Sequence, residues 1–267
     1  MTTSAIASPA VRLTLLRHAT LRLEIGGHVL LVDPMLDAPG ARAPVRGTPE
    51  ERPNPLVPLP MSVREAVAGV DGALLTHTHV DHIDAAGVTA LIPLGLPIFC
   101  QPEDLADLGE LGLDLRPVPD GAPVEWEGLT IRRTGGRHGR EDAMVQANAP
   151  VSGFVVAAGG EPTVYVAGDT VWCPEVAEAI AAHAPDWIVV NAGGARFLQG
   201  GTITMEAADV AAVAEAAPGA RVVAVHAEAI NHCLETREQL AAGLAAAGVD
   251  GRVAIPADGE SLESLDE

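Results

Sequence analysis

The sequence contains no lysine: all 16 of its cationic side chains are arginine, and they stand against 36 acidic ones. The missing lysine excludes Schiff-base chemistry on lysine and the phosphate-binding lysine of a P-loop. The formal net charge of -20 at pH 7 argues against nucleic acid or an anionic membrane as a partner, because phosphate binding needs clustered cations. Aromatic residues make up only 3%, so the core has to be built from alanine, valine, leucine and isoleucine.

Cysteine is scarce as well. Cys100, Cys173 and Cys233 are scattered and odd in number, which fits neither a disulfide framework nor a CxxC metal site, so we expect free thiols in a reducing compartment. The sequence has no apolar run of about 18 residues, and Met1–Pro9 lacks the basic and apolar segments of a signal peptide. We therefore expect a cytoplasmic protein without a membrane span. With 267 residues and 48% hydrophobic content, residues 1–267 are expected to form one domain.

Residues 34–60 carry eight prolines, and no regular element fits this stretch. A long loop inside a compact domain often serves as a lid or a substrate wall. The alternative is a surface excursion that proline holds in place. If the loop has a functional role, it should lie over one side of the active cleft or at a subunit contact.

Short apolar segments separated by turns predict the secondary structure. The expected strands are Val11–Leu16, Leu21–Ile25, His28–Val32, Ala73–Leu75, Ile98–Phe99, Val124–Trp126, Leu129–Arg133, Val151–Ala157, Thr163–Ala167, Trp187–Val190, Arg221–Val225 and Arg252–Ala254. The expected helices are Ser62–Ala68, Ala85–Leu91, Pro102–Leu108, Pro174–His183, Met205–Ala216 and Thr236–Ala246. Hairpins come first and strand–helix alternation follows, which predicts two sheets faced by helices.

The densest group of chemically active residues follows the expected strand Ala73–Leu75, in the sequence THTHVDHID. Residues i and i+2 of an extended segment project to the same side, so His77 and His79 can converge on one metal ion. Asp81 and His82 then turn with the chain and can bind a second ion nearby. A polar turn that opens a helix would not need three histidines, and the spacing therefore predicts metal binding.

Further ligands are expected where other buried strands end. His138 lies in a glycine-rich loop, Asp169 comes just after Thr163–Ala167, and His226 ends Arg221–Val225. Burying such a group without a partner costs several kcal/mol, so a lone polar residue at the end of an apolar strand indicates a function or a cap. Their joint occurrence with the histidine cluster favours a metal site.

The order HxHxDH, His, Asp, His resembles the metallo-β-lactamase superfamily over nearly the whole chain. The resemblance implies an α/β fold, a four-layer αβ/βα sandwich of two mixed β-sheets with a dinuclear metal site at one edge. Carried over by motif, the resemblance also implies seven metal ligands. The first ion would be bound by His77, His79 and His138, and the second by Asp81, His82 and His226. Asp169 would bridge the two ions.

Within the superfamily, Leu16–Thr20 followed by Val29–Pro34 resembles the L-ascorbate-6-phosphate lactonase-like branch of metal-dependent hydrolases, and His226–Cys233 is similar to a bacterial subset of it. The commonest zinc β-lactamases place a cysteine at the second metal and are exported, unlike this chain. Diiron flavoproteins of the superfamily carry a carboxylate where His79 stands, which disfavours an oxygen-reducing iron site. Persulfide dioxygenases use one iron and would leave Asp81 and His82 outside the metal shell; the pattern alone does not separate them.

Imidazole and carboxylate ligands suit Zn²⁺, Mn²⁺ or Fe²⁺, and we take two Zn²⁺ ions as the first expectation. In this scheme, a metal-bridging hydroxide attacks a lactone, ester, amide or phosphodiester. Asp81 both binds metal and orients the nucleophile. His232 and His18 are candidates for a general acid or a substrate contact, and the alternative is that they support a ligand side chain.

Three further carboxylates lie near these motifs in the sequence. Glu228 is a candidate partner for a ligand imidazole. Asp33 and Asp84 are expected to be turn residues or hydrogen-bond acceptors for ligand side chains rather than ligands.

Four arginines near these motifs offer a way to select an anionic small molecule, since a guanidinium binds carboxylate or phosphate bidentately. They are Arg17, Arg137, Arg140 and Arg196. The alternative for each is a salt bridge within this acidic chain.

Two other functions stay open at this stage: an RNA-processing nuclease of the same superfamily, which the net charge disfavours, and a metal-binding protein without turnover. The expected partner is a small-molecule substrate, with no nucleic acid and no membrane, and with a homo-oligomer as an option.

Overall fold

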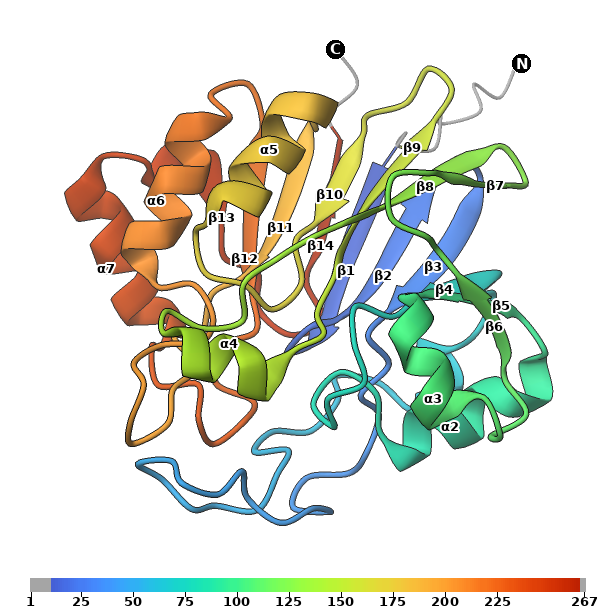
Figure 1. The fold of residues 1–267 in the computed structure, drawn as a ribbon, viewed down its shortest axis with the longest axis horizontal. Coiled ribbons are helices and arrows are strands. Elements are labelled where there is room, and N and C mark those ends of the chain that lie inside the picture. The colour runs from blue at the N-terminus through green and yellow to red at the C-terminus, as the bar shows by residue number, and fades with distance from the viewer. Residues whose placement is uncertain (1–10, 265–267) are drawn as a thin grey trace, which may run out of the picture.

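The computed structural model describes residues 11–264, so the expectation about a signal peptide at Met1–Pro9 concerns residues outside the described range. Two seven-stranded sheets pack face to face, and helices cover their outer faces (Figure 1). The first sheet has the order β14-β1-β2-β3-β4-β5-β6. Its strands are β1 Val11–Arg17, β2 Thr20–Ile25, β3 His28–Val32, β4 Gly72–Leu74, β5 Pro97–Cys100, β6 Asp114–Pro117 and β14 Ser261–Glu263.

The second sheet has the order β13-β12-β11-β10-β9-β8-β7. Its strands are β7 Val124–Trp126, β8 Leu129–Thr134, β9 Gly153–Ala158, β10 Val164–Val166, β11 Trp187–Asn191, β12 Arg221–Val225 and β13 Val253–Ala254. The helices are α1 Val63–Ala66, α2 Ala85–Leu91, α3 Leu105–Leu108, α4 Asp142–Asn148, α5 Pro174–His183, α6 Ala207–Ala216 and α7 Arg237–Ala247, with short 3-10 turns at Ile92–Leu94, Pro102–Asp104 and Asp250–Arg252. Among these residues, no helix is long and apolar enough to cross a membrane.

Side chains alternate between two cores along the central strands. In β3, Leu30 and Val32 face the other sheet, while Leu31 packs against the helices outside. In β11, Val189 points between the sheets and Ile188 points toward α5 and α6. Since both faces of each sheet are covered, these strands are continuously apolar. This four-layer arrangement confirms the αβ/βα sandwich that the sequence predicts.

The strand directions bring the functional segments together. β3 to β6 are parallel to one another, and so are β10 to β13. β1 and β8 run in the same sense as the parallel strands of their own sheets, because each is two antiparallel steps away. Loops that follow β1, β4, β8, β10 and β12 therefore emerge at the carboxyl edges of the sheets, where sites form in such folds.

Several helix boundaries agree with those expected from local sequence signals. α2 and α5 span the residues expected of them, and Ser62 and Glu65 form a capping box at the start of α1. The expected helix Pro102–Leu108 is instead a 3-10 turn followed by α3, and α6 begins two residues later than expected.

Three elements were not predicted. β6 and β14 are edge strands with exposed polar residues, so they lack the apolar alternation that identifies a strand. α4 is a helix of seven residues in the loop after His138.

Candidate metal centre

Nine residues that the sequence singled out for chemistry meet at one edge of the sandwich, and five strands supply them. His18 follows β1, His138 follows β8 and Asp169 follows β10. The cluster of residues 77–82 follows β4, and both His226 and His232 follow β12. These nine residues span more than two hundred positions of the sequence, yet they lie close together in the structure.

The first group of possible ligands consists of His77, His79 and His138, whose ring nitrogens lie within 4.8 Å of one another. Nε2 of His77 is 2.9 Å from Nδ1 of His79, so the i and i+2 positions do converge. Nδ1 of His138 is 2.8 Å from the carbonyl oxygen of Ile203. A proton donated from this Nδ1 leaves the lone pair of Nε2 free to bind a cation.

Asp169 lies between the two groups. Its Oδ2 is 3.3 Å from Nε2 of both His82 and His138, and its Oδ1 is 3.3 Å from Nε2 of His226. Asn191, at the end of β11, donates a hydrogen bond of 2.6 Å to Oδ1 and so fixes the carboxylate. The carboxylate of Asp169 therefore faces both histidine groups, as a bridging ligand must.

Gly168 allows the chain to present Asp169 in this way. It has a φ of +68°, and a Cβ atom on it would lie 2.4 Å from the carbonyl oxygen of Ser152. Only glycine fits this close turn after β10.

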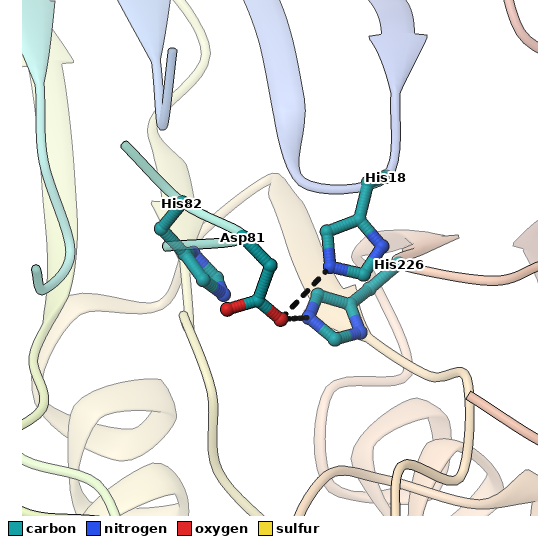
Figure 2. A group of neighbouring side chains, drawn as sticks. All are labelled: His18, Asp81, His82 and His226. Atoms are coloured by element: carbon teal, nitrogen blue, oxygen red, sulfur yellow. Dashed lines mark hydrogen bonds and ion pairs between the residues drawn. The ribbon is translucent and has the colours of Figure 1, made fainter. Parts of the chain in front are cut away.

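The second group consists of His18, Asp81, His82 and His226, again with ligand atoms within 4.8 Å of one another. Figure 2 shows the Asp81 carboxylate between the ring of His82 and the adjacent, mutually tilted rings of His18 and His226. Oδ2 of Asp81 is 3.4 Å from Nε2 of His18 and 3.9 Å from Nε2 of His226. His18 is the member of this group that the resemblance did not place among the ligands.

Hydrogen bonds to neighbouring side chains orient two of these imidazoles. Nδ1 of His82 is 2.8 Å from Oδ2 of Asp33, which also accepts from the hydroxyl of Thr76. Nδ1 of His226 is 3.5 Å from the sulfur of Cys233. Asp33 thus accepts from a possible ligand, as expected, and both histidines turn Nε2 into the centre.

Asp84, the other carboxylate expected not to bind metal, caps α2. Its Oδ1 accepts from the backbone N–H of Gly87 and its Oδ2 from that of Asp37, both at 2.8 Å.

The electrostatics of the centre suit a cation. Burial lowers the pKa of His77 and His226 well below the ordinary value, so both are neutral and their lone pairs are available. Burial disfavours a charged His82 too, but the carboxylates of Asp169 and Asp33 raise the pKa of its ring well above the usual range. Despite burial, the pKa of Asp169 lies well below its usual range because His226, His82 and His138 surround it.

Two observations test whether divalent ions fit here. Nε2 of His82 and Nε2 of His226 are buried and make no hydrogen bond within residues 11–264. Two ligands about 2.0–2.1 Å from a tetrahedral Zn²⁺ lie roughly 3.3–3.4 Å apart, which is the N–O separation that Asp169 has from three imidazoles. Nitrogen and carboxylate donors with these separations fit divalent metal ions, and the donor types admit Zn²⁺, Mn²⁺ or Fe²⁺.

A cavity of about 290 Å³ opens onto the centre. His79, Asp81, His138 and His232 form its polar side. The apolar side comes from Val45, Val80, Phe197 and Ile203, and Thr78 and Asn148 complete the lining. A second, more open cavity of about 570 Å³ adjoins it and shares Phe197 and Asn148.

Comparison with known proteins gives the family. A model of the beta-lactamase superfamily domain matches residues 28–227. The chain belongs to this superfamily. It is 35% identical over 253 residues to the UPF0173 protein YddR of Bacillus subtilis. The aligned residues cover 94% of this chain and 99% of YddR.

Two solved structures resemble this superfamily member closely. A "possible metal-dependent hydrolase" from Veillonella parvula has a TM-score of 0.90 at 30% identity, covering 96% of this chain and 100% of the other. The isothiocyanate hydrolase from Delia radicum gut bacteria has a TM-score of 0.88 at 35% identity, covering 95% and 99%. The narrower resemblance to a lactonase-like branch stays a prediction.

The four arginines that the sequence suggested for anion binding in this beta-lactamase superfamily member are engaged within the protein. Arg137 pairs with Asp142 at 2.5 Å and Arg140 with Asp209 at 2.5 Å. Arg196 pairs with Glu206 at 3.1 Å. Arg17 is fully buried and donates to the carbonyl oxygens of Val57, Met35 and Asp37. The salt-bridge alternative therefore holds for Arg137, Arg140 and Arg196, while Arg17 holds backbone carbonyls in place. None of the four lines the cavity at the centre.

The expectation for Glu228 was wrong. Its carboxylate accepts a hydrogen bond of 2.6 Å from Arg237 and another from that residue's backbone N–H, so it binds the first residue of α7 instead of orienting an imidazole. Sequence reasoning also missed Asn191 and Cys233 as partners of Asp169 and His226. A polar residue that ends the buried strand β11 was the available signal for Asn191.

The proline-rich loop lies beside the centre. Val45 lines the inner cavity and Gly47 the outer one. The loop also contacts the segment that carries His232, because the backbone N–H of Leu56 donates to the carbonyl of Ala229 at 2.7 Å. It occupies the place expected of a substrate wall.

Proposed function

We propose that this protein is a metal-dependent hydrolase with two divalent ions, Zn²⁺ being the expected occupant. One observation carries the proposal: imidazole and carboxylate atoms converge on the floor of a cavity whose remaining wall is mostly apolar. In the proposed arrangement, the first ion is bound by His77, His79 and His138. The second is bound by Asp81, His82 and His226, and Asp169 binds both.

When bound, such ions supply water of lowered pKa and polarise an electrophilic substrate atom. The other tasks fall to the side chains of the chain. Asp81 is ionised despite its burial, since the neighbouring imidazole of His18 holds its pKa well below the usual range. Its carboxylate can therefore accept the hydrogen of an attacking water and orient that water.

His232 faces the same space. Burial lowers the pKa of this imidazole, so it is neutral near pH 7 and can donate a ring N–H. Its Nε2 is 3.9 Å from Oδ2 of Asp81, and its Nδ1 has no hydrogen-bond partner within residues 11–264. A hydrogen bond from His232 to the substrate oxygen or leaving nitrogen would stabilise the charge that develops there.

The substrate class that we propose is a small uncharged electrophile with an apolar substituent. Arg137, Arg140 and Arg196 are paired with carboxylates, so these three offer no free cation to an anionic group. Phe197, Val45 and Ile203 instead offer an apolar surface, and the outer cavity gives room for a longer substituent. The acyl compounds and lactones expected from the sequence belong to this class when uncharged.

An isothiocyanate is a specific member of this class, and the structurally similar hydrolase from Delia radicum gut bacteria is named for it. In its hydrolysis, the water oxygen bonds to the central carbon, the carbon–nitrogen bond breaks and both water protons pass to nitrogen. The products are an amine and carbonyl sulfide. The nitrogen gains these protons from water, and the neutral ring N–H of His232 can hydrogen-bond to it while charge develops there.

The test combines metal analysis with activity. The purified protein would be assayed on benzyl isothiocyanate, p-nitrophenyl butyrate and bis-p-nitrophenyl phosphate, before and after chelation and after metal is added back. We expect two ions per chain, turnover of an uncharged substrate, its loss on chelation and its recovery with metal. Asp169→Asn should remain folded and lack both metal and activity.

Other outcomes would contradict the proposal. Activity that survives removal of the ions would exclude the metal mechanism. Preference for the phosphodiester, with cleavage of structured RNA that falls steeply with salt, would favour the nuclease alternative. Tight metal binding without turnover of any of these substrates would favour a metal-binding protein.

A further inference from the structure

His18 is buried without access to the cavity. Its relative exposure is 0%, and it does not contribute to the lining of the inner cavity, whereas His232 does. A substrate in that cavity would therefore touch His232 and not His18. The role of general acid or substrate contact considered for His18 is not supported by this placement.

The ring of His18 instead points into the second group of possible ligands, with Asp81, His82 and His226 (Figure 2). Its Nε2 is 3.4 Å from Oδ2 of Asp81, and its ring centroid is 3.6 Å from that of His226. We propose, on the basis of the proposed function, that His18 is a further direct ligand of the second metal ion.

The separation between His18 and Asp81 supports ligation. A hydrogen bond between a charged and a neutral group is usually about 2.7–2.9 Å long, and 3.4 Å is well beyond that. With His18 the second ion would have five protein ligands, and neighbouring ligands about 2.0–2.1 Å from a five-coordinate Zn²⁺ stand roughly 2.8–3.6 Å apart. The same separation recurs between Asp169 and three imidazoles that belong to the proposed ligand set.

The backbone supports the same conclusion. His18 has a φ of 61° and His226 a φ of 70°, so both adopt the left-handed conformation that costs a non-glycine residue energy. The peptide N–H of His226 donates to the carbonyl of His18 at 2.9 Å, which holds the two turns together. Strain of this kind persists where the side chain is needed in one place. Here it aims two imidazoles at one point beside Asp81.

The experiment measures metal binding rather than turnover. Zn²⁺ affinity would be determined by competition with chelators, and the visible spectrum of the Co²⁺-substituted protein would report coordination. The first variant is His18→Asn, because asparagine tolerates the left-handed backbone but its side chain is too short to reach the position of Nε2. The second is His18→Gln, whose amide nitrogen can reach that position. His232→Gln is the matched control, because Nε2 of His232 also lies near Oδ2 of Asp81, at 3.9 Å.

We expect both His18 variants to keep the first ion and to bind the second more than about 100-fold more weakly, beyond the 10–100-fold typical of residues that only orient a ligand. Their Co²⁺ spectra should change, while His232→Gln keeps both ions and its spectrum. If His18→Gln restores the affinity that His18→Asn loses, His18 is a donor to Asp81 and the proposal is wrong. Wild-type affinity in both variants would also overturn it.

A measurement on the wild-type protein keeps the proposal testable if the variants do not fold. In ¹¹³Cd-substituted, ¹⁵N-labelled protein, a ring nitrogen that binds the ion shows a coupling to cadmium. A coupling at His18, in addition to those at the other proposed ligands, is expected, and its absence would contradict the inference. A protein that binds two ions but hydrolyses nothing would contradict only the proposed function.

Discussion

Asn54 and Asn231 exchange two hydrogen bonds between the proline-rich loop and the segment that carries His232. Nδ2 of Asn54 donates to Oδ1 of Asn231 at 2.6 Å, and the backbone N–H of Asn231 donates to Oδ1 of Asn54 at 3.0 Å. The Asn231 amide also donates to the hydroxyl of Thr48 at 2.8 Å and accepts from the backbone N–H of Val45 at 2.9 Å. One buried side chain thus fixes the wall of the cavity relative to His232.

This network predicts a strong effect of Asn231→Asp. The variant has the same shape, but a carboxylate oxygen would replace the amide donor and face the carbonyl oxygens of Val45 and Glu50. Each buried group left without a partner costs about 1–3 kcal/mol. We expect lower thermal stability and a raised KM, because the wall that holds Val45 loosens, with a smaller effect on kcat.

The control for this prediction is Glu51→Gln, on an exposed residue of the same loop. It should change neither stability nor KM. If Asn231→Asp lowers stability but leaves KM unchanged, the loop is only a structural clamp and does not shape the substrate wall.

The left-handed backbone of His18 makes a separate prediction about stability. At a φ of 61°, alanine is strained and glycine is not. In the metal-free protein, His18→Gly should therefore be more stable than His18→Ala by about 1–2 kcal/mol, which corresponds to about 2–4 °C in Tm for each kcal/mol. Thermal unfolding in the presence of a chelator measures the difference. The same pair of substitutions at Glu238, in the first turn of α7, should show the opposite order, since glycine destabilises a helix.

Phe197 should control which substituents the enzyme accepts. It lines both cavities, and its ring centroid is 6.2 Å from that of His232. Phe197→Ala removes apolar surface along the path of a long substituent, so kcat/KM should fall about 10-fold for long apolar substrates and much less for short ones.

A homologous series of alkyl isothiocyanates or p-nitrophenyl esters provides the measurement. Leu198→Ala is the control, because Leu198 is 70% exposed and lines only the outer cavity. An equal loss for every chain length would mean that Phe197 supports His232 instead of the substituent.

The candidate site could be predicted largely because its signals are local. His77 and His79 share a side of an extended segment, and Asp169 and His226 each end a strand that is apolar on both faces. The structure brings all of them to one edge. The number of ions and the role of each residue stay predictions, which metal analysis and the variants test.

Other features depend on partners that lie far along the chain, and sequence order does not reveal them. Arg140 is two residues from His138, yet its guanidinium turns to Asp209, 69 residues later. Glu228 is two residues from His226, but the start of α7 brings Arg237 to it. For Arg140 and Glu228, closeness in sequence to a proposed ligand therefore suggested a role at the site, but in the folded protein both side chains bind partners elsewhere. The edge strands β6 and β14 were missed for a related reason, because pairing with a neighbour and not an apolar pattern defines them.

A buried carboxylate away from the metal centre predicts a pH dependence of stability. Asp104 is 1% exposed, and only its Oδ1 has a hydrogen-bond partner within residues 11–264, the amide of Gln101 at 2.8 Å. Burial raises its pKa to about 7. The folded state then holds this proton more tightly than the unfolded chain does, so the contribution of Asp104 to stability is full below about pH 4 and is lost as the pH rises to about 7.

Replacing Asp104 with asparagine removes this dependence. We expect Asp104→Asn to raise Tm at pH 8 and to change it little at pH 4, with a metal chelator present at both values so that the metal centre does not contribute. Glu110→Gln, on an exposed residue nearby, removes the same charge and should not show the trend. A Tm difference between wild type and Asp104→Asn that does not vary with pH would disprove the assignment.

His232 is the residue for which substrate contact and metal binding can be separated most directly. It lines the inner cavity, its Nε2 stands 3.9 Å from Asp81, and burial lowers the pKa of its ring, so it is present as a neutral donor at pH 7. We expect His232→Ala to keep the fold and both ions but to lower turnover roughly 10²–10⁴-fold, the range found when a general acid or an oxyanion donor is removed. His232→Gln, which retains a donor of similar reach, should recover part of the loss if the ring acts by hydrogen bonding, and none if it acts by transferring a proton. A loss of metal in step with activity would instead make His232 a ligand or the support of one, because a side chain that touches only the substrate has no effect on the empty enzyme's affinity for its ions.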